Sequence, residues 1–225
     1  MSAPDMELRH EARREAAPVL GIALAVQVLL ALISYVEGWE LLNRLPWWIW
    51  LVLALPELVL LVDLVSPRAL ARTRRLAIVL LGTLVLGNLA GLAILVGGLV
   101  STSTKSLSGG ELLLSGFAIW LTNAIVFGLW FWEVDNGGPV ARMKRSRKEP
   151  DFQFPQDENP QLAADGWAPS VWDYLYVSLT NSIAFSPTDA LPLSRHAKGL
   201  MGLGSMISVG AVLLVAARAV NVLGA

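Results

Sequence analysis

Five long apolar stretches constrain this chain more than any other feature. A helix needs about 20 mainly apolar residues to cross the hydrocarbon core of a bilayer. The first stretch, Ala16–Val36, has 21 residues and no charged side chain. The others are 45–65, 76–100, 112–132 and 199–217. The sequence therefore predicts an all-α polytopic membrane bundle with five transmembrane helices, plus the short sixth helix discussed below.

Composition supports this class. Hydrophobic residues make up 55% of the 225 residues and charged residues 16%, whereas soluble domains carry about 25% charged residues. A net charge of −1 gives no basic field for nucleic acid. There are no cysteines and only two histidines, His10 and His196, so the sequence indicates neither a thiolate nor a His-rich metal site. It gives no sign of a cofactor.

The distribution of lysine and arginine predicts the orientation, because cytoplasmic loops carry an excess of both. The N-terminal segment 1–15 holds three arginines, loop 66–75 holds four, and the basic run 142–148 holds five cations; the intervening loops hold only Arg44 and Lys105. We therefore expect the N-terminus in the cytoplasm. The basic run could also contact anionic lipid, although an ordinary topogenic cluster explains it as well. Its cations are Arg142, Lys144, Arg145, Arg147 and Lys148.

The chain changes character after the four-helix region 16–135. Segment 136–169 is expected to be a polar, proline-rich cytoplasmic loop. Within it, the prolines and acids of 149–170 predict an extended, solvated linker without a core of its own. A helix is predicted over 170–186, with Ser170 and Asp173 as a capping box and Pro187 ending it. At about 25 Å this helix is short for a crossing. Lys/Arg counts only slightly favour re-entry over a sixth crossing, so 170–225 is read as a re-entrant or short helix, a turn and the last span.

Polar residues recur near the midpoint of the spans. They are Gln27, Glu57, Asn88, Asn123 and Ser208. Glu57 is the most costly, because a charge at the bilayer centre costs about 2.5–3.5 kcal/mol, and it follows Pro56, which removes the helical donor for the Val52 carbonyl. These residues could form an ion or proton site. They could equally be packing contacts between helices, worth about 0.6 kcal/mol each on average.

Pairs of small residues four positions apart predict close packing of the spans. They occur at Gly87 and Gly91, at Ala124 and Gly128, and at Gly204 and Ser208. Such spacing suits the interior of a bundle and the interface of a homo-oligomer equally.

The C-terminal part carries two resemblances. Residues 174–223, which contain the motifs FSPTD and ARAVN, resemble an uncharacterised, largely actinobacterial family of multi-pass membrane proteins. The upstream motif DFQFPQ belongs to the same resemblance. This resemblance implies a bacterial plasma membrane and no particular activity. There is also a fainter resemblance: the short helix 170–186, the turn after it and the last span are similar to the pore module of two-span potassium channels. Residues 181–189 lack the glycines of a potassium filter, however, and charge bias places this segment on the cytoplasmic side.

Two functional hypotheses follow. The first is a channel- or transporter-like protein, whose path would be lined by Glu57 and by Thr180, Asn181, Ser186, Thr188 and Asp189. The second is a non-conducting assembly or accessory subunit. No GxSxG, HExxH or Walker-type motif occurs, so the sequence supports no catalytic residues.

Overall fold

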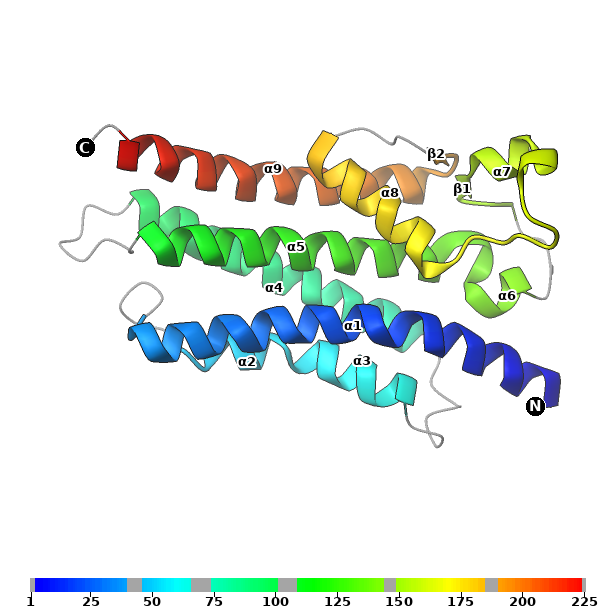
Figure 1. The fold of residues 1–225 in the computed structure, drawn as a ribbon, viewed down its shortest axis with the longest axis horizontal. Coiled ribbons are helices and arrows are strands. Elements are labelled where there is room, and N and C mark those ends of the chain that lie inside the picture. The colour runs from blue at the N-terminus through cyan, green and yellow to red at the C-terminus, as the bar shows by residue number, and fades with distance from the viewer. Residues whose placement is uncertain are drawn as a thin grey trace.

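Four long helices form the frame of the computed structural model, which describes residues 3–39, 46–65, 74–100, 109–143, 149–184 and 190–223. They are α1 (Ala3–Glu37), α4 (Arg74–Val100), α5 (Gly109–Val134) and α9 (Arg195–Leu223), and they run side by side along the long axis of the molecule (Figure 1). Apart from two strands of two residues each, the described elements are helical. The all-α class is therefore confirmed.

Each of these helices contains a segment long and apolar enough to cross a membrane. The segments are Arg14–Glu37, Arg74–Gly97, Gly110–Gly137 and Arg195–Ala217. They coincide with four of the five predicted spans. Their surfaces agree with a lipid environment, because large apolar side chains such as Leu29, Leu86 and Leu213 are more than half exposed.

The remaining predicted span, 45–65, is not one continuous helix. It consists of α2 (Ile49–Leu53) and α3 (Leu55–Val65), separated by a turn at Ala54. The break has the cause expected from the sequence, since Pro56 has no N–H to donate to the Val52 carbonyl. Five transmembrane crossings therefore remain a prediction.

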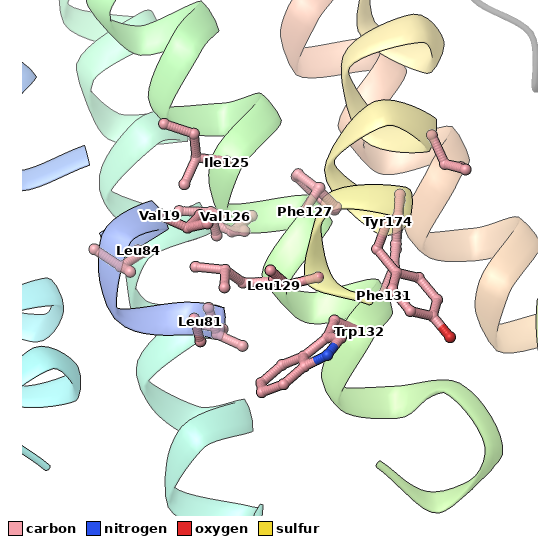
Figure 2. Close-up of a cluster of buried hydrophobic side chains, with 14 of the residues drawn as sticks. Val19, Leu81, Leu84, Ile125, Val126, Phe127, Leu129, Phe131, Trp132 and Tyr174 are labelled. Atoms are coloured by element: carbon pink, nitrogen blue, oxygen red, sulfur yellow. The ribbon is translucent and has the colours of Figure 1, made fainter. Parts of the chain in front are cut away.

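Helix α5 is the central helix of the bundle. Within its most apolar stretch, 72% is buried inside the structure, against 28–39% for the corresponding stretches of α1, α4 and α9. One side packs aliphatic residues such as Val126 against Val19 of α1 and Leu84 of α4, while Phe127 and Phe131 face Tyr174 (Figure 2). Arg74, at the start of α4, donates from Nε to the Glu133 carbonyl and from Nη2 to the Val134 carbonyl, both at 3.0 Å. These bonds satisfy the last carbonyls of α5.

Helices α1, α4 and α9 begin at one end of the bundle, where α5 finishes (Figure 1). We call this the basic end, after Arg14, Arg74 and Arg195. The described part of segment 136–169 lies there, and its residues 149–169 do not form the extended linker expected from their composition. It contains η2 (Asp135–Gly137), α6 (Pro139–Met143), β1 (Phe152–Gln153), α7 (Pro155–Glu158) and η3 (Pro160–Leu162). Phe152 and Phe154 are 1% and 4% exposed, so their rings belong to the hydrophobic core. The many prolines and acids around them gave no indication of this burial in the sequence.

Helix α8 (Val171–Ala184) leaves the basic end, and the chain returns to it as β2 (Leu191–Pro192). At its start, the Val171 N–H donates to Glu15 Oε2 at 3.2 Å, and Ser170 and Asp173 form the expected cap at 2.7 and 2.8 Å. Strand β2 pairs antiparallel with β1, Phe152 opposite Pro192. Both ends of the α8 excursion are thus fastened at the same end of the bundle.

The buried face of α8 is partly polar and its exposed face is apolar. Its polar residues Ser178, Asn181 and Ser182 are buried, while Trp172, Tyr176 and Ile183 are 48–59% exposed. Helix α8 approaches α5 closely at Gly128, where an added Cβ would lie 3.0 Å from the Leu175 Cα. This contact agrees with the predicted role of the Ala124–Gly128 pair, because only a residue without a side chain allows it.

Candidate functional site

The five polar mid-span residues fall into two separate groups. Gln27, Glu57 and Asn88 lie on the side of α5 that faces α1, α3 and α4, whereas Asn123 and Ser208 lie between α5 and α9. Successive residues of a helix point about 100° apart, so neighbours on α5 serve different sides of the bundle. Their common depth in a bilayer stays a prediction, and the sequence alone did not show which of these residues meet.

Glu57 is the one acidic residue among these five, and it is completely buried. Its side chain is 0% exposed and its Oε1 accepts a hydrogen bond of 2.9 Å from Gln27 Nε2. Glu57 Oε2 and Gln27 Oε1 have no hydrogen-bond partner among the described residues. Glu57 is the third residue of α3, directly after the break, so the helix interruption and the acid occupy the same place.

Gln27 also lines a small cavity between α1, α2, α4 and α5. Its volume is about 20 Å³, enough for one water molecule. Asn88 and Thr122 contribute the other polar side chains of the lining, and Leu53, the last residue of α2, is one of the apolar ones. The Thr122 hydroxyl lies 3.2 Å from Asn88 Oδ1 and 2.8 Å from the Ala118 carbonyl. We call this group of Gln27, Glu57, Asn88 and Thr122 the Glu57 site.

Thr122 is the member of the Glu57 site that the sequence analysis missed. It is 3% exposed and lies at the depth of Asn123, its neighbour in sequence. A rule that considers every hydroxyl near the middle of a predicted span would have included Thr122, but it would have included the exposed Thr83 as well. Only the packing of α4 against α5 distinguishes the two.

Asn123 and Ser208 form a separate contact between α5 and α9. Asn123 Nδ2 donates to Ser208 Oγ at 3.0 Å and to the Gly204 carbonyl at 3.1 Å. The ring of Phe127 covers Gly204 at 3.1–3.3 Å from the position of a Cβ. This is the geometry expected of a polar contact that holds two spans together.

Two of the candidate path-lining residues on α8 can be placed. Asn181 is 4% exposed and its Nδ2 donates to the Met201 carbonyl of α9 at 3.0 Å. Thr180 bonds back to the Tyr176 carbonyl of its own helix at 2.8 Å. Both residues are thus engaged in helix contacts. Ser186, Thr188 and Asp189 lie outside the described residues.

A second polar cluster, which we call the Asp135 cluster, closes the basic end. Asp135 is 2% exposed; its Oδ1 accepts from the N–H groups of Asp151 and Phe152 at 2.7 and 3.1 Å, and its Oδ2 accepts from the Tyr174 hydroxyl. Arg142 donates from Nη1 to the Trp132 and Asp135 carbonyls at 2.7 and 2.8 Å and lies 5.0 Å from the centre of the Tyr174 ring. Together these contacts join α5, α6, β1 and α8.

Burial disfavours the charged phenolate and raises the pKa of the Tyr174 phenol well above its usual value, and the nearby Arg142 guanidinium opposes that rise. Tyr174 therefore remains a hydrogen-bond donor to Asp135 at neutral pH. The Asp135 cluster gave no motif in the sequence, because its members come from four elements.

Arg142 is the one cation of the basic run that lies among the described residues, and it is buried. It is 9% exposed, so its guanidinium serves the protein interior and is not a surface cation. Lys144, Arg145, Arg147 and Lys148 lie outside the described residues. A contact with anionic lipid stays a prediction for these four.

Beside the Asp135 cluster lies a larger cavity of about 480 Å³. Its wall includes Arg142 and the acids Asp135 and Asp157, together with Phe154 and Trp167. Charges of both signs line it, and both oxygens of Asp135 are already bonded within the protein. Its walls therefore favour neither an anion nor a cation.

No group of three or more His, Asp or Glu side chains that could hold a metal ion occurs in the described parts of the chain. Comparison with family models, with curated proteins and with solved structures found no match. The chemistry of the site must therefore be argued from its own residues.

Proposed function

We propose that the chain is an integral membrane protein with five crossings and one helical hairpin that dips into the bilayer. The four apolar helices support four crossings. Helices α2 and α3 supply the fifth, because together they cover 17 residues, Ile49–Val65, beside α1. A broken span is tolerated in a bilayer where its freed backbone groups are covered by protein.

The arrangement of α8 supports re-entry over a sixth crossing. Both ends of the excursion are bonded at the basic end, through Glu15 and through β1. The exposed side chains Trp172, Tyr176 and Ile183 suit lipid acyl chains, and the polar face is turned to α5 and α9. A single cysteine replacing Thr188 tests this directly in a chain without cysteines. We expect labelling from the side of the basic end; labelling from the opposite side alone would establish a crossing.

The bias of lysine and arginine supports a cytoplasmic basic end and N-terminus. The resemblance to an actinobacterial family supports the plasma membrane of a bacterium. Gly128 and Gly204 belong to two of the three small-residue pairs that could have formed a homo-oligomer interface. Both glycines instead contact other helices of the same chain. Gly87 and Gly91 of the third pair approach Leu53 and Ile119, so these pairs support packing within one chain.

For the molecular function we propose a channel- or transporter-like protein in which a cation passes by way of the Glu57 site. The observation that carries this proposal is the complete burial of Glu57 beside a broken helix, with the neutral Gln27 as its one hydrogen-bond partner among the described residues. A buried acid at this depth costs free energy and brings no ion pair that would offset it. In transporters, interrupted helices near the bilayer midplane supply carbonyl groups and helix ends to ions.

The second candidate is a non-conducting assembly or accessory subunit. It is favoured by the polar residues outside the Glu57 site, which are bonded within the protein: Asn123 to Ser208, Ser178 to the Ala124 carbonyl and Asn181 to the Met201 carbonyl. On this view most polar residues hold helices together and no ion crosses.

Flux measurements on purified protein in liposomes separate the two. We expect wild-type protein to conduct or exchange a cation, tested with gradients of H⁺, Na⁺ and K⁺, and Glu57→Gln to abolish the flux. Glu37→Gln is the matched control, because it makes the same change at an exposed position at the end of α1. Silence of the wild type for all three ions, with and without a membrane potential, would favour the accessory role.

A further inference from the structure

Glu57 and Gln27 hold two buried oxygens that have no hydrogen-bond partner among the described residues. The two side chains are joined on one side only, by the 2.9 Å bond from Gln27 Nε2 to Glu57 Oε1. The atoms left over are Glu57 Oε2 and Gln27 Oε1. Glu57 is 0% and Gln27 7% exposed, so bulk water does not satisfy these oxygens. A buried acceptor without a donor is costly, and here one pair of side chains has two of them.

One proton supplies the hydrogen that this pair lacks. A protonated carboxyl has one O–H donor beside its acceptor oxygen, whereas an ionised carboxylate has acceptors only. With the proton on Oε2, Glu57 donates to Gln27 Oε1 while Gln27 Nε2 donates to Glu57 Oε1, and acid and amide pair through two hydrogen bonds. The existing bond already holds the planar carboxyl against the planar amide. A rotation of these end groups is therefore all that the second bond requires.

The described spans around Glu57 contain no cation that could balance an ionised carboxylate. Helix α3 packs against α1, α2 and α4. Their apolar residues 16–36, 49–53 and 76–100 include no lysine, arginine, histidine or acid. On α3 itself the other acid or base is Asp63, six residues further along, which has the same sign as Glu57. An isolated buried carboxylate is far more costly than the neutral acid, so these surroundings favour a bound proton.

The small cavity beside Gln27 suits a water molecule and not a metal ion. Its volume of about 20 Å³ admits one water. Most of its lining is apolar, and Glu57 is not part of it. The unpartnered atoms of its polar lining residues are Gln27 Oε1, an acceptor, and Asn88 Nδ2, a donor. A water molecule can donate to the first and accept from the second, whereas an amide N–H group repels a metal ion.

The position of Glu57 at the start of α3 makes release of the proton possible. Glu57 lies in the first turn of α3, just after the break at Ala54. The N-terminal end of a helix carries a partial positive charge, which stabilises a negative side chain. When the proton leaves, this end of α3 lowers the cost of the charge that remains on Glu57. A permanently neutral acid would not need this position.

We propose that Glu57 and Gln27 form a proton-binding pair, and that the proton held between Glu57 Oε2 and Gln27 Oε1 is the cation of the Glu57 site. On binding, a hydronium ion gives its proton to Oε2 and becomes water, one O–H bond forms, and the carboxylate loses its negative charge. Release reverses these changes, and no other covalent bond is altered. The proposal rests on the proposed function and names its ion. Acids inside membrane spans take this role in the proton relays of pumps and transporters.

Infrared spectroscopy detects the bound proton without requiring transport. A protonated buried carboxyl gives a C=O stretching band above the amide I region, and the band moves to lower wavenumber in D₂O; an ionised carboxylate lacks it. We expect purified full-length protein in liposomes at neutral pH to show this band, and Glu57→Gln to lose it. Glu37→Gln is the matched control, because Glu37 is exposed, and it should keep the band.

Two further measurements test the partner and the competing ions. Gln27→Met keeps the length of the side chain but removes the donor to Glu57, so the band should move to higher wavenumber. Thr83→Val, at an exposed position of α4, should leave it in place. Saturating Na⁺, K⁺ or Ca²⁺ should also leave the band unchanged, since a metal ion that replaced the proton would remove it. Gel filtration shows that each variant is folded, and the nearly isosteric Glu57→Gln keeps the test decisive if Gln27→Met is not.

Three results would overturn the proposal. The first is absence of a Glu57-dependent band at neutral pH, and the second is its removal by one of the metal ions. The third is a band that does not shift after prolonged incubation in D₂O, because its proton would not exchange with water.

These outcomes are distinct from those of the flux measurements. A Glu57-dependent band that shifts in D₂O, in a protein that conducts nothing, would support proton binding and refute the transport role. Flux of Na⁺ or K⁺ that Glu57→Gln abolishes, in a protein without the band, would support the transport role and refute proton binding.

Discussion

Replacing Tyr174 with phenylalanine removes one hydroxyl group from the Asp135 cluster and nothing else. The Tyr174 side chain is 0% exposed and Asp135 is 2% exposed, so water cannot replace the lost donor without a rearrangement. Asp135 Oδ1 keeps its two bonds from the N–H groups of Asp151 and Phe152. Asp135 Oδ2 loses the bond from Tyr174 and becomes a buried, charged acceptor without a partner.

The magnitude follows from the charge on the acceptor. A hydrogen bond to a charged group contributes about 1.5–3 kcal/mol to stability, roughly twice a neutral one. For a chain of 150–250 residues, 1 kcal/mol corresponds to about 2–4 °C in Tm. We therefore expect Tyr174→Phe to lower the Tm in detergent by about 3–12 °C. Tyr176→Phe is the matched control, because Tyr176 lies on the same helix, is 48% exposed and should give no change.

A double-mutant cycle isolates the interaction from other effects of the substitution. Asp135→Asn is combined with Tyr174→Phe, and the free energy of unfolding of all four proteins is measured from tryptophan fluorescence. We expect a coupling energy of at least about 1 kcal/mol, since the two side chains contact each other directly. Hydrogen exchange of the peptide 150–154 should increase in both single variants, because Asp135 holds the amides of Asp151 and Phe152.

Three results would refute this reasoning. One is a Tm for Tyr174→Phe equal to that of Tyr176→Phe. Another is additivity of the two substitutions in the cycle. The third is rapid exchange of the 150–154 amides already in the wild type, which would mean that segment 136–169 is not fastened to the bundle.

Four further outcomes are expected. The stability contributed by the Tyr174 phenol, whose pKa burial raises, is complete below about pH 10 and is lost as the pH rises above it; alkaline unfolding curves should show this loss in wild type and not in Tyr174→Phe. Gly128→Val should destabilise by about 1–3 kcal/mol through collision with Leu175, and a Tm equal to wild type would contradict the close α5–α8 contact. Glu57→Gln should leave the Tm unchanged or higher, because it removes a buried acid while an amide can still bond Gln27; a large loss of stability would mark Glu57 as a structural residue. A nitroxide at position 183, on the exposed face of α8, should be relaxed by oxygen more than by a water-soluble nickel reagent, and the reverse would place that face in water.

Much of the framework follows from local sequence. The apolar stretches around Leu29, Leu86 and Leu213 are long enough to cross the hydrocarbon core as helices, and a helix satisfies its own backbone hydrogen bonds within lipid. The cap at Ser170 and the break at Pro56 are also local, because each depends on groups within four residues. These features could be predicted because their physical causes lie within one or two helical turns.

The linker over 149–170 was predicted wrongly for an equally physical reason. Four prolines and several acids describe a chain that does not form long regular elements, but they do not exclude burial of individual rings. Phe152 and Phe154 find their partners in Phe131 and Tyr174, which are distant in sequence. The same holds for Arg142, whose guanidinium is turned inward by two carbonyls and the Tyr174 ring.

The sequence by itself determined that this chain is helical, that four of its helices are apolar enough to cross a membrane, and at which position along its helix each polar side chain lies. Only the tertiary structure decided which of those side chains meet. Gln27 reaches Glu57 and shares a cavity with Asn88, while Asn123 turns to Ser208, because the rotation of each helix about its own axis fixes which face meets which neighbour. That rotation is set by the packing of all helices together, since the apolar surface of a span is nearly the same on every side and favours no direction alone.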